Sequence, residues 1–335
     1  MIASAPGKLI LTGEYAVLDG APAVVIAVDR RAVARVRAGA PRGSSPFLLA
    51  VATELAHRRG ADDPAARIAL DIAVDSSAFY DGLTKLGLGS SAAVTVAATA
   101  LALGATPASA RATTAGQSAA AELRAMRDEV LAIAMAAHAT AQGARGARGS
   151  GADVAACTHG GAIVFTPGAP PRIEKKKWPA SVLLIPFFTR VSADTPTLVA
   201  QVAAARAARK TEVDAALAAI ADASQAASKA LSAPPDLAVT AVIGGFALAA
   251  SAIDRLALAT GLALVPPCVS AARSALARLG GTAKTTGAGG GDVGIAVIPT
   301  TADVTVATRL LLEAGCEPLR LALDETGVDL RPSAS

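Results

Sequence analysis

The sequence is poor in aromatic residues and in charged residues. Aromatic residues make up 3% of the 335 positions and charged residues 17%, while alanine supplies much of the 53% hydrophobic fraction. This composition is typical of a globular chain and excludes a highly charged disordered one. The net charge of +4 comes from mixed basic and acidic residues, so no nucleic-acid partner is predicted. The lysine run 175–177 is expected in a solvated turn.

Cysteine and histidine are also scarce. The three cysteines have no C-x-x-C spacing, so a disulfide framework or a zinc site is not expected: Cys157, Cys268 and Cys316. A reducing, cytoplasmic location fits this cysteine use. The three histidines form no metal-ligand pattern and are expected in structural or surface roles: His57, His138 and His159.

No segment is interpreted as a signal peptide or a membrane span. Residues 1–17 lack a basic start, and a proline, a glycine and two charged residues interrupt their apolar character. Residues 86–110 are uncharged, but their glycines, serines and threonines are more typical of a loop followed by a buried helix. We therefore expect no membrane partner.

Hydrophobic periodicity predicts strands and helices mixed in both halves of the chain, an α+β class. Expected strands cover 2–12, 23–38 (one bent strand or two), 67–74, 160–167, 182–188, the end of 285–299, and 318–323. Expected helices cover 47–59, 90–104, 107–143 (as a pair), 195–231, 236–260, 267–279 and 302–314. Thr195 and Pro196 are predicted as N-cap and first residue of one helix. Segment 168–179 is a hairpin tip or a domain boundary, which suggests domains 1–170 and 171–335.

The segment KLGLGSSAAVT, residues 85–95, places glycines and serine hydroxyls just before a predicted helix. Glycine lets backbone N–H groups turn toward an anion, and the helix adds N–H groups and the positive end of its dipole. Such a segment could bind phosphate, or it could simply cap the helix. The segment differs from the Walker pattern.

Two further motifs lie near the ends of the chain. Residues 4–18, SAPGKLILTGEYAVL, place Lys8 between apolar stretches, where a lone lysine is usually a charge at a strand edge. Residues 284–296, KTTGAGGGDVGIA, contain a glycine-rich loop that leads into a predicted strand. Such a loop costs conformational entropy unless its backbone must pass close to something.

Together the three motifs resemble those of the GHMP kinases, the superfamily of galactokinase, homoserine kinase, mevalonate kinase and phosphomevalonate kinase. The matching elements are PGKLILTGE, GLGSSA and GAGGG, in that order and spread over nearly the whole chain. The resemblance implies an N-terminal domain like ribosomal protein S5 domain 2 and a ferredoxin-like C-terminal domain. It also implies ATP along the central loop.

Residues 137–156, AHATAQGARGARGSGADVAA, are most similar to the phosphomevalonate kinase form of this superfamily. Asp292 after the third motif and Lys85 before the second are further similarities to that form. Gln142 falls where mevalonate kinases more often have glutamate, which weakens the expected metal binding. Tyr15 falls where mevalonate kinase usually has histidine.

The resemblance implies roles for individual residues. Lys8 and Asp153 are the implied catalytic pair, and Ser91 the implied magnesium ligand. ATP is implied to bind at Lys85, Gly87, Leu88, Gly89, Ser90, Ser91 and Ala92. The acceptor is implied to bind at Lys8, Tyr15, Arg148, Ser150, Gly151, Asp153, Thr195, Gly287, Ala288 and Gly289.

The expected reaction is ATP-dependent phosphorylation of 5-phosphomevalonate by a monomer or homodimer. Its acceptor phosphate is mostly dianionic at pH 7, so cations such as Lys8, Lys85 and Arg148 matter more than a base. Mevalonate kinase or another GHMP small-molecule kinase is the alternative. An inactive sensor that binds ATP or a metabolite is an alternative of another class, which intact Lys8, Ser91 and Asp153 argue against.

Overall fold

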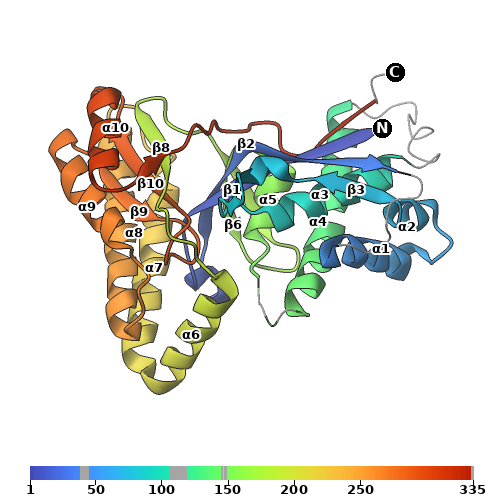
Figure 1. The fold of residues 1–335 in the computed structure, drawn as a ribbon, viewed down its shortest axis with the longest axis horizontal. Helices are drawn as coiled ribbons and strands as arrows, with labels where there is room; N and C mark the ends of the chain where they lie inside the picture. Colours follow the sequence, from blue (N-terminus) through green and yellow to red (C-terminus); the bar gives the residue numbers. More distant parts are fainter. Residues whose placement is uncertain (38–44, 106–118, 145, 147–148, 333–335) are drawn as a thin grey trace.

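The computed structural model describes residues 1–37, 45–105, 119–144, 146 and 149–332. Within these ranges the chain builds two main sheets with helices packed against them, in two units that lie beside each other (Figure 1). The mixture of helices and antiparallel strands in both units confirms the predicted α+β class.

The first sheet has six strands among the described residues, in the order β12-β1-β2-β6-β7, with β3 also paired to β2. These strands are β1 (Ile2–Thr12), β2 (Ala23–Val36), β3 (Ile72–Asp75), β6 (Ala162–Thr166), β7 (Arg172–Lys176) and β12 (Asp329–Arg331). Runs of β-branched residues explain the long β1–β2 pair. A register shift between Pro6 and Gly7 bends it, so β2 is one bent strand.

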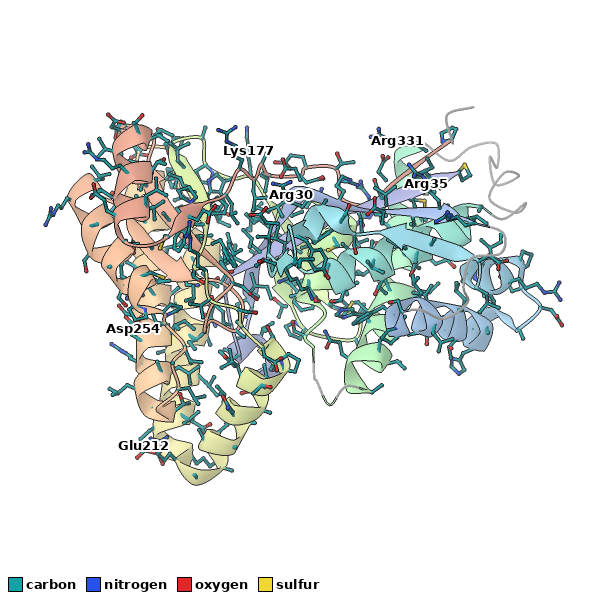
Figure 2. The ribbon with its side chains drawn as sticks, viewed as in Figure 1. Arg30, Arg35, Lys177, Glu212, Asp254 and Arg331 are labelled. Carbon is teal, nitrogen blue, oxygen red and sulfur yellow. The ribbon has the colours of Figure 1, made fainter. Side chains whose placement is uncertain are left out.

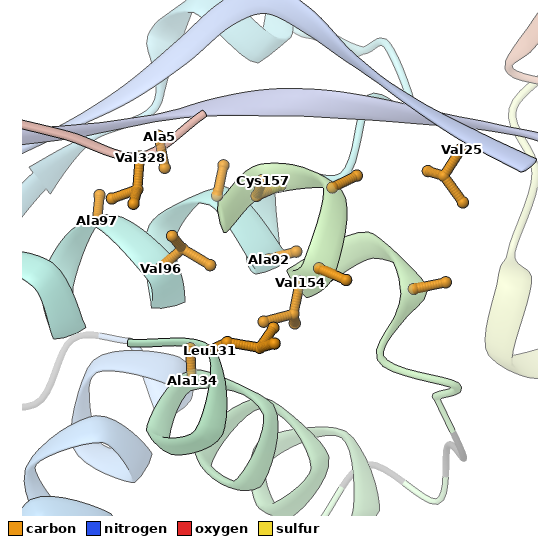
Figure 3. Close-up of a cluster of buried hydrophobic side chains, with 14 of the residues drawn as sticks. Ala5, Val25, Ala92, Val96, Ala97, Leu131, Ala134, Val154, Cys157 and Val328 are labelled. Atoms are coloured by element: carbon orange, nitrogen blue, oxygen red, sulfur yellow. The ribbon is translucent and has the colours of Figure 1, made fainter. Parts of the chain in front are cut away.

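Helices α1 (Pro46–Arg59), α2 (Pro64–Ala69), α3 (Ser90–Gly104), α4 (Ala119–Gly143) and α5 (Ala152–His159) belong to this first unit. Figure 1 shows α3 and α5 next to the strands, with α1 and α4 as an outer layer. Small side chains allow this close packing, because α3 is largely alanine. Figure 3 shows the interlocked core, with labelled side chains from β1, β2, α3, α4, α5 and the C-terminal segment: Ala5, Val25, Ala92, Val96, Ala97, Leu131, Ala134, Val154, Cys157 and Val328.

The second sheet has the order β11-β8-β10-β9. Its strands are β8 (Val182–Phe188), β9 (Thr282–Thr285), β10 (Val293–Pro299) and β11 (Glu317–Pro318). The helices of this unit are α6 (Thr195–Ala208), α7 (Lys210–Ala230), α8 (Ala238–Thr260), α9 (Pro267–Leu276) and α10 (Val304–Glu313). Short 3₁₀ helices η1 (Ala16–Asp19), η2 (Ser77–Phe79) and η3 (Ala277–Leu279) and the hairpin β4 (Tyr80–Asp81)–β5 (Thr84–Lys85) complete the described elements.

Helix α8 is long and apolar enough, by length and composition, to cross a membrane. In the structure, 44% of its most apolar window is buried inside the protein. The buried side includes Phe246, which contacts the Trp178 ring edge-on, with 6.0 Å between ring centroids. The buried face of α8 thus contributes to the protein core.

Several predicted elements are wrong in detail. The strand expected at 67–74 is the end of α2 followed by β3, because Asp63 caps a helix that starts at Pro64. The helix expected at 195–231 is broken at Arg209, whose backbone is not helical, with φ of −133° and ψ of 58°. Asp194, not Thr195, is its N-cap residue. The helix pair expected at 107–143 is a single helix from Ala119 where the structure describes it, and residues 106–118 lie outside the described residues.

Segment 168–179 forms the turn and second strand of a hairpin, since β7 pairs with β6. The lysine run therefore ends a strand rather than forming a turn, with Lys177 exposed beyond it (Figure 2). The strand expected at 318–323 is only two residues long, and the chain then returns to the first sheet, where β12 pairs with β1. Arg35 and Arg331 both lie opposite Ile2 on the two neighbours of β1 (Figure 2). The domain limits 1–170 and 171–335 stay a prediction.

Candidate active site

A cavity of about 500 Å³ brings the three sequence motifs together. Its walls come from β1 and the turn after it, the β4–β5 hairpin, and the loops before α3, α5, α6 and β10. The predicted site residues that line it are Lys8, Tyr15, Lys85, Gly87, Gly89, Ser90, Ser91, Ser150, Asp153, Thr195, Gly287 and Ala288. Residues far apart in the sequence therefore share one space.

Some predicted site residues do not line this cavity. The side chains of Leu88 and Ala92 are fully buried, so only their backbone could contact a ligand. Gly151 packs against Met135, and Gly289 lies against the backbone of Leu264. Arg148 lies outside the described residues.

The central loop, residues 87–91, has two glycines that other residues could not easily replace, because their φ values are positive and a side chain would collide with neighbouring atoms. Gly87 and Gly89 have φ of +71° and +78°, which side chains disfavour, and Gly89 is the N-cap residue of α3. A Cβ on Gly89 would lie 2.6 Å from Cε of Lys8. The backbone N–H of Lys8 donates to the carbonyl of Leu88 at 2.8 Å. The loop is thus fixed against β1, with the N-terminus of a 15-residue helix open to the cavity.

Asp153 lies in the first turn of α5, which begins after Gly151 in a left-handed conformation. Its Oδ1 accepts a hydrogen bond from the N–H of Val154 at 2.9 Å. Asp153 and Lys8 face the same cavity, as the predicted catalytic pair requires. A carboxylate there can attract a cation or accept a proton from an acceptor hydroxyl.

His138 contacts two of the predicted site residues, although only a structural or surface role was expected for it from the sequence. Its Nε2 lies 3.2 Å from Oγ of Ser91 and 3.9 Å from Oδ2 of Asp153, so it connects the central loop with α5. The imidazole is buried and stacks on the ring of Phe47, with 5.3 Å between centroids. The signal was present in the motif AHATAQG, which contains His138, but a buried histidine looks the same in sequence as a surface one.

The third motif is hydrogen-bonded to the first. The Tyr15 hydroxyl donates to the carbonyl of Ala288 at 2.5 Å, and the N–H of Gly287 donates to the carbonyl of Ile10 at 3.2 Å. Glu14 and Lys284 form a fully buried ion pair behind this contact. Burial raises the pKa of Glu14, while the charge of Lys284 lowers it. These contacts fix the glycine loop beside β1.

The residues present fit a cation that arrives with a nucleotide. Among the described residues, no group of three or more histidine, cysteine or acidic side chains is placed to hold a metal ion. Oxygen donors nevertheless line the cavity: Ser91, Gln142, Asp153 and Asp292. Magnesium prefers oxygen ligands and is often held by one or two protein groups together with substrate phosphates.

Comparison with known proteins gives relatives over the full chain length. A curated phosphomevalonate kinase from Streptomyces sp. (strain CL190) is 29% identical, and the alignment covers 96% of each chain. The structure of Streptococcus pneumoniae phosphomevalonate kinase with phosphomevalonate and AMPPNP superposes with a TM-score of 0.69 at 18% identity, covering 96% of this chain and 99% of that one. The chain is thus similar to GHMP kinases over nearly its whole length.

Other solved structures share the GHMP kinase fold. A Lin0012 protein from Listeria innocua superposes with a TM-score of 0.76 at 20% identity, covering 98% of this chain and 99% of that one. Structures of a mevalonate kinase, a galactokinase and a homoserine kinase also superpose. No family model matches the sequence. The findings support a GHMP kinase and confirm the predicted fold.

Proposed function

We propose that the protein transfers the γ-phosphoryl group of ATP to (R)-5-phosphomevalonate, forming (R)-5-diphosphomevalonate in the mevalonate pathway. The observation that carries the proposal is the cavity lined by the central loop, Lys8 and Asp153. The central loop is also called the phosphate loop from here on, after its proposed role. The likeness to a phosphomevalonate kinase over 96% of both chains favours this acceptor over mevalonate. The predicted cytoplasmic location and the monomeric or homodimeric state remain predictions.

The central loop supplies the nucleotide site in this proposal. Backbone N–H groups at the start of α3 would orient the ATP phosphates, and Ser91 and one or two further oxygens would hold magnesium. Magnesium supplies charge neutralisation at the transferred phosphoryl group. Lys8 and Lys85 add positive charge to the same cavity.

The acceptor chemistry determines the role of Asp153. An oxygen of the acceptor phosphate attacks the γ-phosphorus, the bond to the β-phosphate oxygen breaks, and ADP leaves. That acceptor oxygen is already largely deprotonated at pH 7, because the second pKa of a phosphomonoester is about 6. Asp153 would therefore orient Lys8 and the acceptor rather than remove a proton.

A direct test is ADP release from the purified protein with 5-phosphomevalonate and with mevalonate in parallel. We expect turnover with 5-phosphomevalonate, and a raised KM for it in Lys85→Ala, because Lys85 lies on the cavity wall. Turnover with mevalonate alone would instead support the mevalonate kinase alternative. ATP binding without turnover of either acceptor would favour the sensor.

A further inference from the structure

Asp292 lies directly on the phosphate loop, although it comes from the opposite end of the sequence. It ends the glycine-rich loop before β10 and lines the cavity. A Cβ on Gly87 would lie 2.6 Å from Oδ2 of Asp292, so the carboxylate packs against the backbone of Gly87, which has no side chain in the way. A negative charge therefore lies against the loop that the proposed function assigns to the ATP phosphates.

The position of this carboxylate is tightly fixed. The Asp292 carbonyl accepts hydrogen bonds from the N–H of Thr189 at 2.9 Å and from its hydroxyl at 3.0 Å. The N–H of Asp292 donates to the carbonyl of Val191 at 2.6 Å, and Oδ1 accepts from the N–H of Ala193 at 3.3 Å. Four contacts from the segment after β8 thus hold both the backbone and the carboxylate.

The backbone of Asp292 is also strained. Its φ is +51°, in the left-handed region where a residue with a side chain costs free energy and glycine does not. The three preceding positions, 289–291, are glycines. Replacement of Asp292 by glycine would remove this strain and would remove the carboxylate with it.

The charges around the Asp292 carboxylate have opposite effects on it. Burial raises the pKa of Asp292, while the N–H of Ala193 and the positive charges of Lys8 and Lys85 lower it. ATP phosphates on the loop would add several negative charges and repel the carboxylate, unless a cation lay between them. The neutral Gln142 on the cavity wall supplies no charge for such a cation. A divalent cation that prefers oxygen ligands could bind both the ATP phosphates and the Asp292 carboxylate.

We propose that Asp292 is a ligand of the divalent cation that enters with ATP, together with Ser91 on the wall of the same cavity. This inference rests on the proposed function, since it assigns the cation to a nucleotide complex. The carboxylate would also select for metal-bound nucleotide, because free ATP would be repelled by it. The structure thus assigns to the third motif a binding role in addition to its contact with the first.

The test is the affinity for AMPPNP, measured by isothermal titration calorimetry with Mg²⁺ and with EDTA. Mn²⁺ uptake in the presence of AMPPNP, followed by electron paramagnetic resonance, gives a second readout that does not require turnover. The main variant is Asp292→Asn, because asparagine tolerates a left-handed backbone. Asp292→Gly, which suits the same φ, is the second variant should Asp292→Asn not fold. Asp194→Asn, which removes another carboxylate from the cavity wall, is the control.

We expect Mg²⁺ to tighten AMPPNP binding to the parent protein, and Asp292→Asn to lose about tenfold or more of that tightening. Without metal, Asp292→Asn should bind AMPPNP as well as the parent or better, because repulsion is removed. The control should keep the tightening to within about twofold.

An unchanged effect of Mg²⁺ in both Asp292 variants, with a parent that binds AMPPNP and turns over, would overturn this inference and leave the proposed function intact. A parent that binds no AMPPNP with or without metal would overturn both. Weaker binding in EDTA as well as in Mg²⁺ would also contradict the inference, since it would indicate a general distortion of the loop.

Discussion

Glu14 and Lys284 form an ion pair in the interior, with both side chains about 1% exposed. Lys284 also donates to the carbonyls of Leu11 at 2.8 Å and Thr285 at 2.5 Å, so its three donors are satisfied. Oε2 of Glu14 is buried and has no hydrogen-bond partner among the described residues. The pair joins the turn after β1, in the first motif, to β9, which leads into the glycine loop of the third.

We expect Lys284→Met to lower the free energy of unfolding by about 3–5 kcal/mol, because it leaves Glu14 buried without a countercharge. Urea denaturation followed by circular dichroism measures the loss. The double variant Glu14→Gln with Lys284→Met should recover part of it, since the unpaired charge is then gone. A loss below about 1 kcal/mol in the single variant would show that Glu14 is not left as a buried unpaired charge.

Ser91→Ala should slow metal-dependent turnover on the order of 10²-fold while leaving the fold intact. The serine lies at the start of α3 on the cavity wall, and its hydroxyl is the proposed metal ligand. Steady-state kinetics at saturating ATP and varied Mg²⁺ measure the effect, with thermal unfolding as the control for folding. Turnover within about twofold of the parent would exclude Ser91 from the site.

His138→Phe should lower kcat about tenfold or more, because Ser91 then loses the imidazole that fixes its hydroxyl. Glutamine can replace the Nε2 contact, so His138→Gln should keep more activity than His138→Phe. In a Ser91→Ala background, His138→Phe should have little further effect, since both changes remove the same contact between His138 and Ser91. Additive losses would contradict a role through Ser91, and the exposed His57→Gln serves as control.

Asp153→Asn should slow phosphorylation of 5-phosphomevalonate, and the loss should persist from about pH 7 to 9. The variant keeps the shape of the side chain and removes its charge, while the acceptor phosphate needs no base over this range. The pH dependence of kcat for the variant and the parent measures this. A variant whose rate climbs steeply while the parent stays flat would make Asp153 a general base and favour a hydroxyl acceptor.

His159 should make the protein less stable in acid. Burial, with smaller contributions from Arg127 and Lys175, lowers the pKa of His159 from 6.5 to about 4. The unfolded chain therefore takes up the proton first, so the stabilisation is complete above pH 6.5 and is lost as the pH falls to about 4. Urea denaturation at pH 7 and 4.5 should show His159→Gln losing up to about 3 kcal/mol less than the parent between these values. An equal loss in both proteins would show that the pKa of His159 is the same in the folded and unfolded chains.

The long strands and the helices of the sequence motifs could be predicted because their signals are local. Residues 2–12 and 182–188 are apolar runs, and both are strands in the structure. Helix α3 starts at Ser90 as predicted, after two glycines whose positive φ ends any strand. Local signals failed at Arg209, where nothing in the alanine-rich sequence around it marks the break between α6 and α7.

The sequence by itself determined the resemblance to GHMP kinases, the order of the three motifs and twelve of the residues that line the cavity, because glycine loops and a lysine between apolar runs have recognisable local patterns. Only the tertiary structure decided which side chains meet. Nothing in sequence spacing brings His138 to Ser91, 47 positions away, or Asp292 to Gly87. These contacts depend on how α4 packs beside α3 and on where the loop before β10 meets the central loop, which are results of long-range packing.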